Sequence, residues 1–303
     1  MKSTEQNGKR PEKAFFIFGH NISHTLSPTL HNTGFWELGL PYHYNIHQTQ
    51  SVDESVEEII KRDDFGGASV TFPHKLQIGR LLDSVTPCAE KIGAVNTVIV
   101  NESSGERRLL GDNTDWHGIK RCIEKSGVKG LQSSAALILG AGGAARAACY
   151  AFLELGISEV LIVNRTLSKA QDMADQFPGI KSCVLATLED SVADRQQHGN
   201  AGKLPIRAIV ACVPADDLGK DKIPSELFSG AETGVLIEMA YRPQVTGMMA
   251  RASCQGGWEV FRGVDVLEEQ GYAQFELWTG KRAPVPVMRA AMQAKIKENA
   301  QAK

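Results

Sequence analysis

A glycine-rich turn that connects an apolar segment to an alanine-rich segment constrains the fold of this chain more than any other feature. Residues 135–139 are apolar and long enough for a buried strand, and residues 144–155 have high helix propensity. Between them lie Gly140, Ala141, Gly142 and Gly143, and the expected helix begins at Ala144. A second apolar segment, residues 159–163, follows the helix. Strand, glycine turn, helix and strand in this order predict one half of a dinucleotide-binding fold.

The glycine positions in this turn suit a bound pyrophosphate. Gly140 permits a tight turn, and Gly142 lets the backbone approach a pyrophosphate at the positive N-terminus of the helix. Ala145 occupies the close-packing position, which takes Gly or Ala. The alternative is a tight turn in an ordinary α/β unit, and the placement between strand and helix disfavours it.

The residues after the second strand favour NADP over NAD. An NAD site usually has Asp or Glu here, which binds the 2′-hydroxyl of the ribose. This chain has Asn164, Arg165 and Thr166, followed by Lys169. The two cations, and the absence of a carboxylate, suit a 2′-phosphate. We therefore expect NADP, with NAD as the alternative cofactor. The structural alternative is that Arg165 and Lys169 only form the solvated start of a helix.

The composition leaves room for two domains and excludes several classes of partner. The chain has 303 residues and a net charge of −2, so we expect no chain-wide basic surface for nucleic acid. No apolar run approaches the roughly 20 residues of a membrane span, and the N-terminus lacks the apolar core of a signal peptide. Six scattered cysteines without a C-x-x-C pair indicate reduced thiols in a cytoplasmic protein. The histidines show no metal-binding spacing, so we expect no metal.

Strand-like and helix-like segments also alternate in the first 115 residues, which predicts a separate α/β domain with mostly parallel strands. The expected strands are residues 14–18, 42–47, 67–72, 94–100 and a strand from Leu109 that runs into a loop by Asp115. The expected helices are residues 28–38 with Ser27 as the N-cap, residues 52–61, and a helix from Pro73 to Leu82.

The dinucleotide domain is expected to begin with a connecting helix. Further strands and helices are expected after its first strand, glycine turn, helix and strand. Its further expected elements are a helix at 116–125, strands at 206–212, 235–239 and 258–261, and a helix at 245–255. Residues 188–204 predict a helix fragment and an exposed loop. Helices at 270–278 and 286–297 are expected to return to the first domain. The predicted fold is thus a two-domain α/β protein. A substrate-binding α/β domain comprises residues 14–115, completed by 265–299, and a Rossmann-type NADP-binding domain comprises residues 116–264.

Polar residues gather where the strands of the first domain are expected to end, which is the ligand-binding edge of an open α/β sheet. These candidates are Thr25, Ser27, Thr71, Lys75, Asn96, Asp112 and Asp115. Hydroxyl and amide groups suit a polyhydroxylated substrate, because each substrate hydroxyl needs a donor and an acceptor. A lysine at a strand end, such as Lys75, can carry a proton to or from an alcohol. The alternative for Lys75 is a surface cation at a helix start.

Several motifs follow one another along the chain: His24 to Pro28 with His31 and Asn32, Val70 to Lys75, Gly93 to Thr97, Asn113 to Asp115, Gly140 to Ala144, Asn164 to Thr166, Glu238 to Pro243, and Gln270. In these motifs and in their order, the chain resembles the shikimate dehydrogenase family, which includes the quinate dehydrogenases. The resemblance extends from Phe15 to Met288.

The resemblance implies reversible hydride transfer between NADP(H) and a ring alcohol, from shikimate to 3-dehydroshikimate, as in aromatic amino acid biosynthesis. It implies that Lys75 is the acid/base group with Asp115 beside it, that Thr71, Asn96, Tyr241 and Gln270 line the substrate, and that Thr25 and Ser27 lie near its carboxylate. Quinate dehydrogenation with NAD or NADP, as in quinate catabolism, is an alternative. A catalytically silent relative that senses a metabolite is another. We expect a monomer or a homodimer.

The chain also departs from the family pattern in the first loop and around the cofactor. Thr25 replaces a usual serine, which reshapes the pocket near the carboxylate and keeps quinate open as a substrate. Residues 211–214 replace an Asn-Ala-Thr-like segment, and Asp265 stands where a glycine near the nicotinamide is common, so that its charge could alter cofactor placement. Glu238 stands where Asp is common, which is a small change.

Overall fold

The computed structural model describes residues 12–102, 105–196, 203–216 and 218–301. The chain divides into two compact units, and each contains its own six-stranded sheet. The first unit comprises residues 1–85, 96–112 and 271–303, and the second unit comprises residues 86–95 and 113–270. In the described part of the chain, no helix combines the length and the apolar character needed to cross a membrane.

The sheet of the first unit is mixed. Its strands are β1 (Lys13–Gly19), β2 (Tyr42–Gln48), β3 (Phe65–Val70), β4 (Ser84–Val85), β5 (Thr97–Asn101) and β6 (Arg108–Asp112), in the order β2-β1-β3-β5-β6-β4. Strand β1 pairs in parallel with β2 and β3, as the sequence predicts for mostly parallel strands. β5 runs antiparallel to both of its neighbours, β3 and β6, which the sequence analysis did not foresee.

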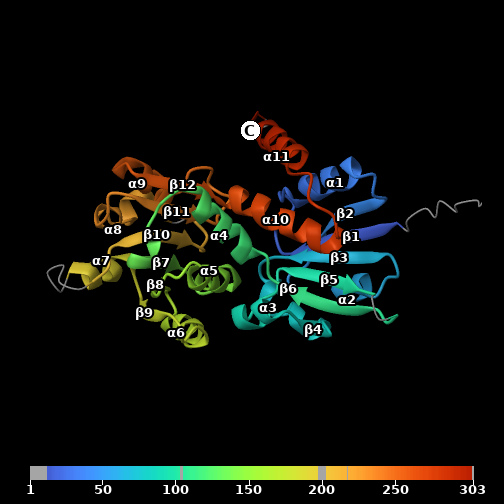
Figure 1. Cartoon of the computed structure of the whole chain (residues 1–303), viewed down its shortest axis with the longest axis horizontal. Helices are drawn as coiled ribbons and strands as arrows, with labels where there is room; N and C mark the ends of the chain where they lie inside the picture. The colour runs from blue at the N-terminus through green and yellow to red at the C-terminus, as the bar shows by residue number, and fades with distance from the viewer. Residues whose placement is uncertain (1–11, 103–104, 197–202, 217, 302–303) are drawn as a thin grey trace, which may run out of the picture. The chain divides into compact units, whose positions relative to one another are not determined.

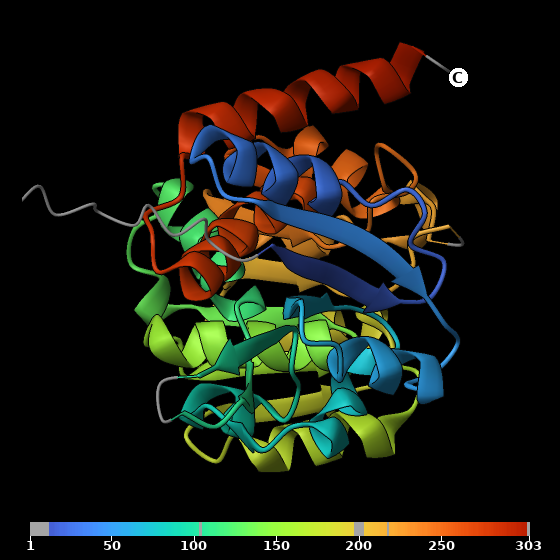
Figure 2. The same cartoon turned by 90° about the vertical axis from the view of Figure 1, so that its right-hand side faces the viewer.

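Two long helices of the first unit lie side by side. These are α1 (Ser27–Glu37) and α11 (Val285–Gln301), and Figure 2 shows α11 running along α1. Their close approach needs a small residue, because a Cβ added at Gly34 of α1 would lie 3.0 Å from Sδ of Met288 in α11. α2 (Glu54–Ile60) is capped by Asp53, whose carboxylate accepts from the backbone N–H groups of Ser55 and Val56.

The helix expected from Pro73 to Leu82 is instead two short 3₁₀ turns. They are η1 (His74–Leu76) and η2 (Ile78–Leu81), and no side chain caps either of them. A regular helix is costly to nucleate over so few residues, and Gly79 lowers its propensity further. The expectation that Ser27 caps α1 is also wrong, because the helix already includes Ser27 and has no side-chain cap.

The sheet of the second unit is entirely parallel. Its strands are β7 (Ala135–Leu139), β8 (Glu159–Val163), β9 (Lys181–Leu185), β10 (Ile206–Ala211), β11 (Gly234–Glu238) and β12 (Trp258–Arg262). Their order is β12-β11-β10-β7-β8-β9, and Figure 1 shows the central strands in this succession. This is the 3-2-1-4-5-6 order of the Rossmann fold, which confirms the predicted fold class.

Helices cover both faces of this parallel sheet. They are α3 (Pro87–Ile92), α4 (Asp115–Lys125), α5 (Gly143–Glu154), α6 (Leu167–Gln176), α7 (Leu188–Gln196), α8 (Glu226–Ser229) and α9 (Gly247–Gln255), with 3₁₀ turns η3 (Leu131–Ser133) and η4 (Lys220–Lys222). α7 matches the helix fragment expected at 188–204, and most of the loop expected there lies outside the described residues. α10 (Gly263–Thr279) contributes residues 263–270 to this unit and the remainder to the first unit.

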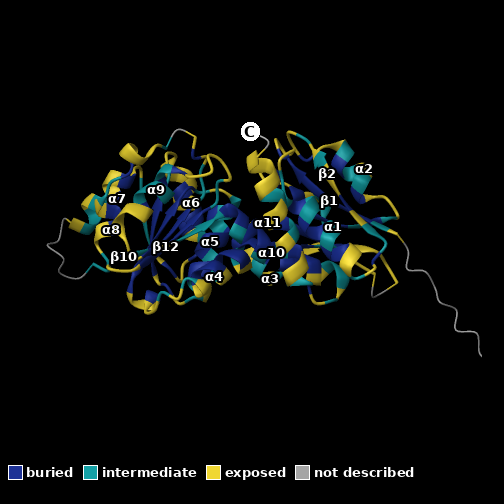
Figure 3. Ribbon diagram, turned by 90° about the horizontal axis from the view of Figure 1, so that it is seen from above, coloured by how far each residue is buried: buried dark blue, intermediate teal, exposed yellow. Residues whose placement is uncertain are grey.

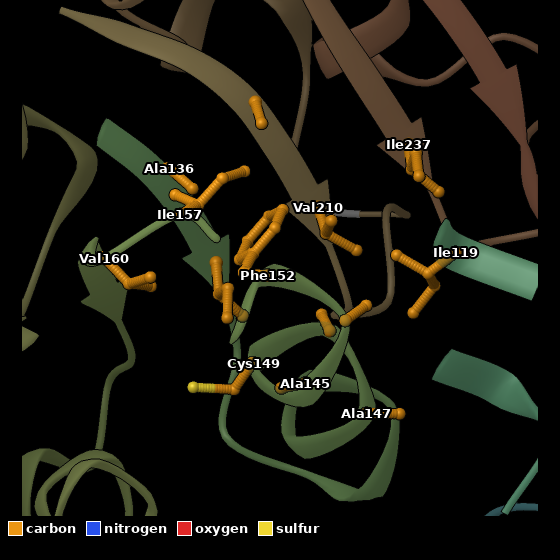
Figure 4. Packing of buried hydrophobic residues seen from close by; sticks show 14 of the residues in the cluster. Ile119, Ala136, Ala145, Ala147, Cys149, Phe152, Ile157, Val160, Val210 and Ile237 are labelled. Carbon is orange, nitrogen blue, oxygen red and sulfur yellow. The ribbon is translucent and has the colours of Figure 1, made fainter. Parts of the chain in front are cut away.

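Alternate residues of each strand fill two separate hydrophobic cores. Ala136 and Ile138 of β7 belong to one core, and Leu137 and Leu139 belong to the other. In the first core, Phe152 of α5 reaches the sheet beside Ile157 and Val210 (Figure 4). The strands β7, β8, β10 and β11 are therefore buried on both faces, and the strands gathered near the β10 and β12 labels in Figure 3 are mostly dark blue. This buried sheet positions the loops at its carboxyl edge.

Candidate functional site

The first unit presents Lys75 on the η1 turn, shortly after strand β3 ends. The connecting residue Thr71 extends the sheet by one bond, since its N–H donates to the carbonyl of Phe18 over 2.9 Å. The N–H of His74 then donates to the carbonyl of Thr71 over 2.8 Å, which closes the turn that carries Lys75. Lys75 and Thr71 are both half-buried. The local backbone thus places a cation and a hydroxyl group at the ligand-binding edge of the first sheet.

Two local features stabilise the η1 turn. The buried His74 ring lies with Nε2 at 2.7 Å from Oγ1 of Thr49, and burial lowers the pKa of His74. Gly19, at the end of β1, allows the strand ends to approach each other closely. A Cβ added at Gly19 would overlap the methyl carbon of Thr71, so no larger residue fits there without a shift of the turn.

Thr25 and Ser27 form a pair of hydroxyl groups in the loop between β1 and α1. Their oxygens lie 3.1 Å apart, and the N–H of Ser27 donates to Oγ1 of Thr25 over 3.3 Å. Ser27 is buried and Thr25 is half-buried. Two adjacent hydroxyl groups match the two oxygens of one carboxylate.

Asn96 immediately precedes β5 and is bound to both neighbouring strands. Its N–H donates to the carbonyl of Asp112 over 3.0 Å, and its carbonyl accepts from the N–H of Val70 over 2.7 Å. Its side-chain Oδ1 accepts from the hydroxyl group of Thr97 over 2.6 Å. The residue is only 2 % exposed. Asn96 is therefore a rigidly placed amide in the same unit as Thr71 and Lys75.

The second unit forms the glycine turn that the sequence predicts. Gly140 has a φ of +114°, and a Cβ there would lie 3.2 Å from the carbonyl oxygen of Cys212. Gly142 is the N-cap of α5, and no atom lies within 4 Å of a Cβ added to it. Ala145 is fully buried against the sheet. The backbone N–H groups of Gly143 and Ala144 begin the helix here, which gives an anion-binding terminus with open space in front of it.

The basic residues expected to hold a 2′-phosphate are exposed at the carboxyl end of β8. Arg165 and Lys169 are both exposed, and neither forms an ion pair with another described residue. The amide of Asn164 donates to the carbonyl of Thr166 over 2.8 Å, which shapes the loop before α6. These side chains are accessible to an anionic ligand.

Asp115 and Gln270 are buried together in the second unit. Asp115 is the first residue of α4, and its N–H donates to Oδ1 of Asn113 over 3.0 Å. The hydroxyl group of Thr114 donates to Oε1 of Gln270 over 3.0 Å. Gly118 lets the start of α10 approach α4, because a Cβ there would lie 2.7 Å from the carbonyl oxygen of Val266. The helix contact therefore fixes Asp115 and Gln270 relative to each other.

Tyr241 lies in the turn after β11, and Glu238 shapes this turn. Tyr241 is 50 % exposed, which leaves it accessible to a ligand, while partial burial and the charge of Asp115 both raise the pKa of its hydroxyl group. The buried carboxyl of Glu238 accepts from the N–H of Ala240 over 3.0 Å and from the hydroxyl group of Thr246 over 2.7 Å. Burial raises the pKa of Glu238, although these two donors oppose the shift. Glu238 thus ties the Tyr241 turn to the start of α9.

The residues that depart from the family pattern near the expected cofactor site have local structural roles. Asp265 accepts from the N–H of Arg262 over 2.7 Å and pairs with the Arg262 guanidinium at 3.5 Å, so its charge is partly neutralised at the start of α10. Cys212 continues β10 into a loop, since its N–H donates to the carbonyl of Leu139 over 2.8 Å. Val213 packs beside the glycine turn, with a methyl carbon 3.2 Å from the position of a Cβ on Gly140.

The sequence analysis missed several polar residues that support the candidates in the first unit. Tyr44, Ser69, Thr97 and Gln274 are all buried and hydrogen-bonded to one another or to Asn96. A polar residue inside an apolar strand, such as Ser69 in β3, was a usable signal. Gln274 gave no local signal, because its partners are more than 170 residues away in the chain.

Three protein-family models match the chain. The shikimate dehydrogenase substrate-binding domain matches residues 17–98, the shikimate/quinate 5-dehydrogenase model matches residues 123–196, and the shikimate 5′-dehydrogenase C-terminal domain matches residues 263–293. These ranges include Lys75, the glycine turn, Arg165 and Gln270, whereas Asp115 and Tyr241 lie between the matched ranges.

Among curated relatives, the pentafunctional AROM polypeptide of Malassezia globosa is 43 % identical over 285 residues, which cover 91 % of this chain. The chain spans only 17 % of that polypeptide. Among solved structures, dehydroquinate dehydratase and shikimate dehydrogenase from S. pombe AroM is 35 % identical with a TM-score of 0.78, over 94 % of this chain and 53 % of that one.

Smaller enzymes match over nearly their full length. The shikimate 5-dehydrogenase from Thermus thermophilus, solved in complex with NADP(H) and shikimate, is 32 % identical with a TM-score of 0.75, over 93 % of this chain and 99 % of that one. The alignment with this relative spans both units, each of which has the architecture that the resemblance implied. The chain therefore belongs to the shikimate dehydrogenase family.

Proposed function

We propose that this chain catalyses reversible, NADP-dependent hydride transfer between shikimate and 3-dehydroshikimate. The observation that carries this proposal is the position of Lys75, on a turn closed by Thr71 at the carboxyl end of β3. It is supported by the Thermus relative, which binds shikimate and NADP(H) and matches this chain over 99 % of its own length. The proposal assigns substrate binding to residues 14–115 with 265–299, and cofactor binding to residues 116–264.

The second unit fits NADP in two independent respects. Open space in front of Gly142 and the start of α5 suit a pyrophosphate, and the left-handed Gly140 permits the tight turn beneath it. The exposed cations Arg165 and Lys169, with Asn164 and Thr166, suit the 2′-phosphate. When bound, the nicotinamide supplies or accepts the hydride.

The residues of this chain then supply binding, orientation and proton transfer. As a ketone is reduced, negative charge develops on its oxygen, and the Lys75 ammonium stabilises that charge and delivers the proton. In the oxidative direction the neutral amine of Lys75 accepts the proton of the alcohol. We assign to Asp115 the orientation of the ammonium, which an anionic acceptor can hold by a charge-assisted hydrogen bond.

The substrate contacts follow from the type and placement of the remaining side chains. We assign the carboxylate to the paired hydroxyl groups of Thr25 and Ser27, whose oxygens lie 3.1 Å apart. Asn96 and Thr71 in the first unit, and Gln270 and Tyr241 in the second, are assigned to the ring hydroxyl groups. Alternating donors and acceptors suit a polyhydroxylated ring.

Quinate is the second substrate to test, because the methyl group of Thr25 changes the pocket beside the assigned carboxylate site. NAD is the second cofactor to test, since a related shikimate 5-dehydrogenase from Listeria monocytogenes was solved with shikimate and NAD. We further propose a cytoplasmic enzyme that acts as a monomer or a homodimer, with no nucleic acid or membrane partner. The AROM relatives match this chain over only a fraction of their own length. The proposed activity is therefore that of this chain and not of a whole AROM polypeptide.

A four-way initial-rate assay tests the proposed function. Shikimate and quinate are each supplied with NADP and with NAD, and the reduced cofactor is followed by absorbance. We expect the dominant rate with shikimate and NADP. A dominant rate with quinate would contradict the substrate assignment, and a dominant rate with NAD would contradict the cofactor assignment. No rate in any of the four, with cofactor still bound, would favour a catalytically silent metabolite sensor.

A further inference from the structure

A continuous chain of buried hydrogen bonds runs behind Asn96 in the first unit. The hydroxyl group of Tyr44 donates to Oγ of Ser69 over 2.6 Å, and Ser69 donates to Oε1 of Gln274 over 2.9 Å. The amide nitrogen Nε2 of Gln274 donates to the carbonyl of Asn96 over 3.1 Å and to Oγ1 of Thr97 over 2.9 Å. Each of these five residues is at most 6 % exposed.

In this series of hydrogen bonds, the backbone carbonyl of Asn96 can take only one role. A backbone carbonyl such as that of Asn96 can only accept hydrogen bonds, so Gln274 must direct its NH₂ group toward it. The same NH₂ group then donates to Thr97, whose oxygen accepts. The single hydroxyl hydrogen of Thr97 is left to bind Oδ1 of Asn96, at 2.6 Å. The donor and the acceptor of every hydrogen bond in this series follow from that one carbonyl.

This sequence of bonds determines which end of the Asn96 amide serves as the donor end. With Oδ1 bound to Thr97, the side chain directs Nδ2 away from Thr97. We infer that Gln274 and Thr97 are positioning residues that orient Asn96, so that it donates a hydrogen bond to an oxygen of the substrate and does not accept one. This inference rests on the proposed function, because it concerns the same substrate.

The inferred orientation suits both directions of the proposed reaction. An alcohol oxygen and a ketone oxygen can each accept from an amide N–H, whereas a ketone oxygen cannot donate to an amide carbonyl. A fixed donor therefore keeps its bond when the ring oxygen changes from alcohol to ketone. An amide in the opposite orientation would lose its bond to a ketone.

Variants of Thr97 and Asn96 test the inference through binding constants for shikimate and its monodeoxy analogues. The Asn96→Ala variant first shows which analogue lacks the hydroxyl group bound by Asn96. That analogue has the same dissociation constant for the variant as for the wild type. Thr97→Val then removes the donor to Oδ1. We expect about tenfold weaker binding of shikimate, corresponding to about one hydrogen bond, and unchanged binding of that same analogue.

The matched control is Thr97→Ser, which retains the hydroxyl group and is expected to bind shikimate within about twofold of wild type. Equal weakening of every analogue by Thr97→Val would show a merely structural role and overturn the inference, as would no weakening at all. Melting temperatures of all variants are measured alongside.

A second substitution keeps the inference testable if Thr97→Val does not fold. In Asn96→Asp, Thr97 still has an oxygen to bind, but the donor end is replaced by an acceptor. We expect 3-dehydroshikimate, whose ketone oxygen cannot donate, to bind at least as weakly as it binds to Asn96→Ala, and binding close to wild type would overturn the inference. Failure of the proposed function is distinguishable, since wild-type protein would then not bind shikimate.

Discussion

Oγ1 of Thr49 accepts a hydrogen bond from the His74 ring, because Thr49 already donates its hydroxyl hydrogen to the carbonyl of Ser51 over 2.8 Å. Nε2 of His74 therefore carries a hydrogen. Nδ1 is buried without a hydrogen-bond partner in the described structure. The residue that precedes Lys75 is thus a buried histidine anchored through one nitrogen.

Replacing Thr49 by Val should loosen this anchor. The Nε2–H group of His74 would remain buried without an acceptor, and we expect a loss of about 1–3 kcal/mol in the free energy of unfolding. Urea denaturation measures the loss. Thr49→Ser is the matched control and should retain wild-type stability. Equal stabilities of the Val variant and the wild type would show that this hydrogen bond contributes nothing.

Lys75→Ala should abolish most of the turnover while leaving cofactor binding intact. The variant lacks the group that stabilises the developing negative charge and transfers the proton, and a loss of at least about 10²-fold in kcat is expected. Initial rates measure turnover, and fluorescence titration with NADPH measures cofactor binding. Lys61→Ala, at an exposed lysine of the same unit, is the control. An unchanged rate for Lys75→Ala would refute the assigned role.

Arg165→Asp should weaken NADP binding much more than NAD binding. The substitution places a carboxylate where a 2′-phosphate is expected, so that attraction becomes repulsion for NADP only. Dissociation constants for both cofactors are compared at low and high salt, since screening reduces the effect for an exposed side chain. Arg282→Asp makes the same charge change at an exposed residue of the other unit. Similar losses for both cofactors would contradict the 2′-phosphate assignment.

His31 should make the protein less stable in acid. Its ring is fully buried against Tyr44, at 4.6 Å between ring centroids, and neither ring nitrogen has a hydrogen-bond partner among the described residues. Burial lowers the pKa of His31 to about 3, and the nearby Gln274 opposes the shift only in part. Between pH 6.5 and about 3 the unfolded chain binds a proton that the folded chain does not, so stability falls by up to about 1.4 kcal/mol per pH unit.

His31→Phe preserves the ring stacking and removes the titration. We expect the stability difference between the variant and the wild type to grow in favour of the variant as the pH falls from 6.5 to about 4. Denaturant unfolding at several pH values measures it. His74, whose pKa is also lowered by burial, is present in both proteins and cancels in the comparison. Parallel pH profiles would rule out the assigned titration.

The sequence was most informative where structure depends on neighbouring residues. The glycine turn, the strands beside it and the buried Ala145 all follow from local pattern, because a βαβ unit is a local motif. The start of α3 was also readable, since Thr86 caps it, Pro87 follows, and Gly93 ends it with a φ of +68°. It was missed because the segment is short.

The sequence predictions were wrong or incomplete where the structure depends on contacts between residues far apart in the chain. Near Lys75, only the shortness of the segment and Gly79 disfavour a regular helix, and the buried His74 beneath the two 3₁₀ turns is held by Thr49 of a different loop. Gln274 binds Ser69 across 205 residues, and no local pattern predicts such a pair. Strand β5 runs antiparallel to β6 across a short connection between Asn101 and Arg108, but it also runs antiparallel to β3 after a long connection. The chain direction within a sheet cannot be inferred from hydrophobicity alone.

The first unit is assembled from three stretches of chain, and its last stretch begins at residue 271. Trp278 and Gln274, from this last stretch, donate hydrogen bonds to the carbonyls of Val98 and Asn96, beside strands made much earlier. During synthesis on a ribosome, the second unit has all of its residues before the first unit does. The half of the protein translated first is therefore the half that finishes folding last, and its exposed sheet must stay free of aggregation until the C-terminal helices emerge.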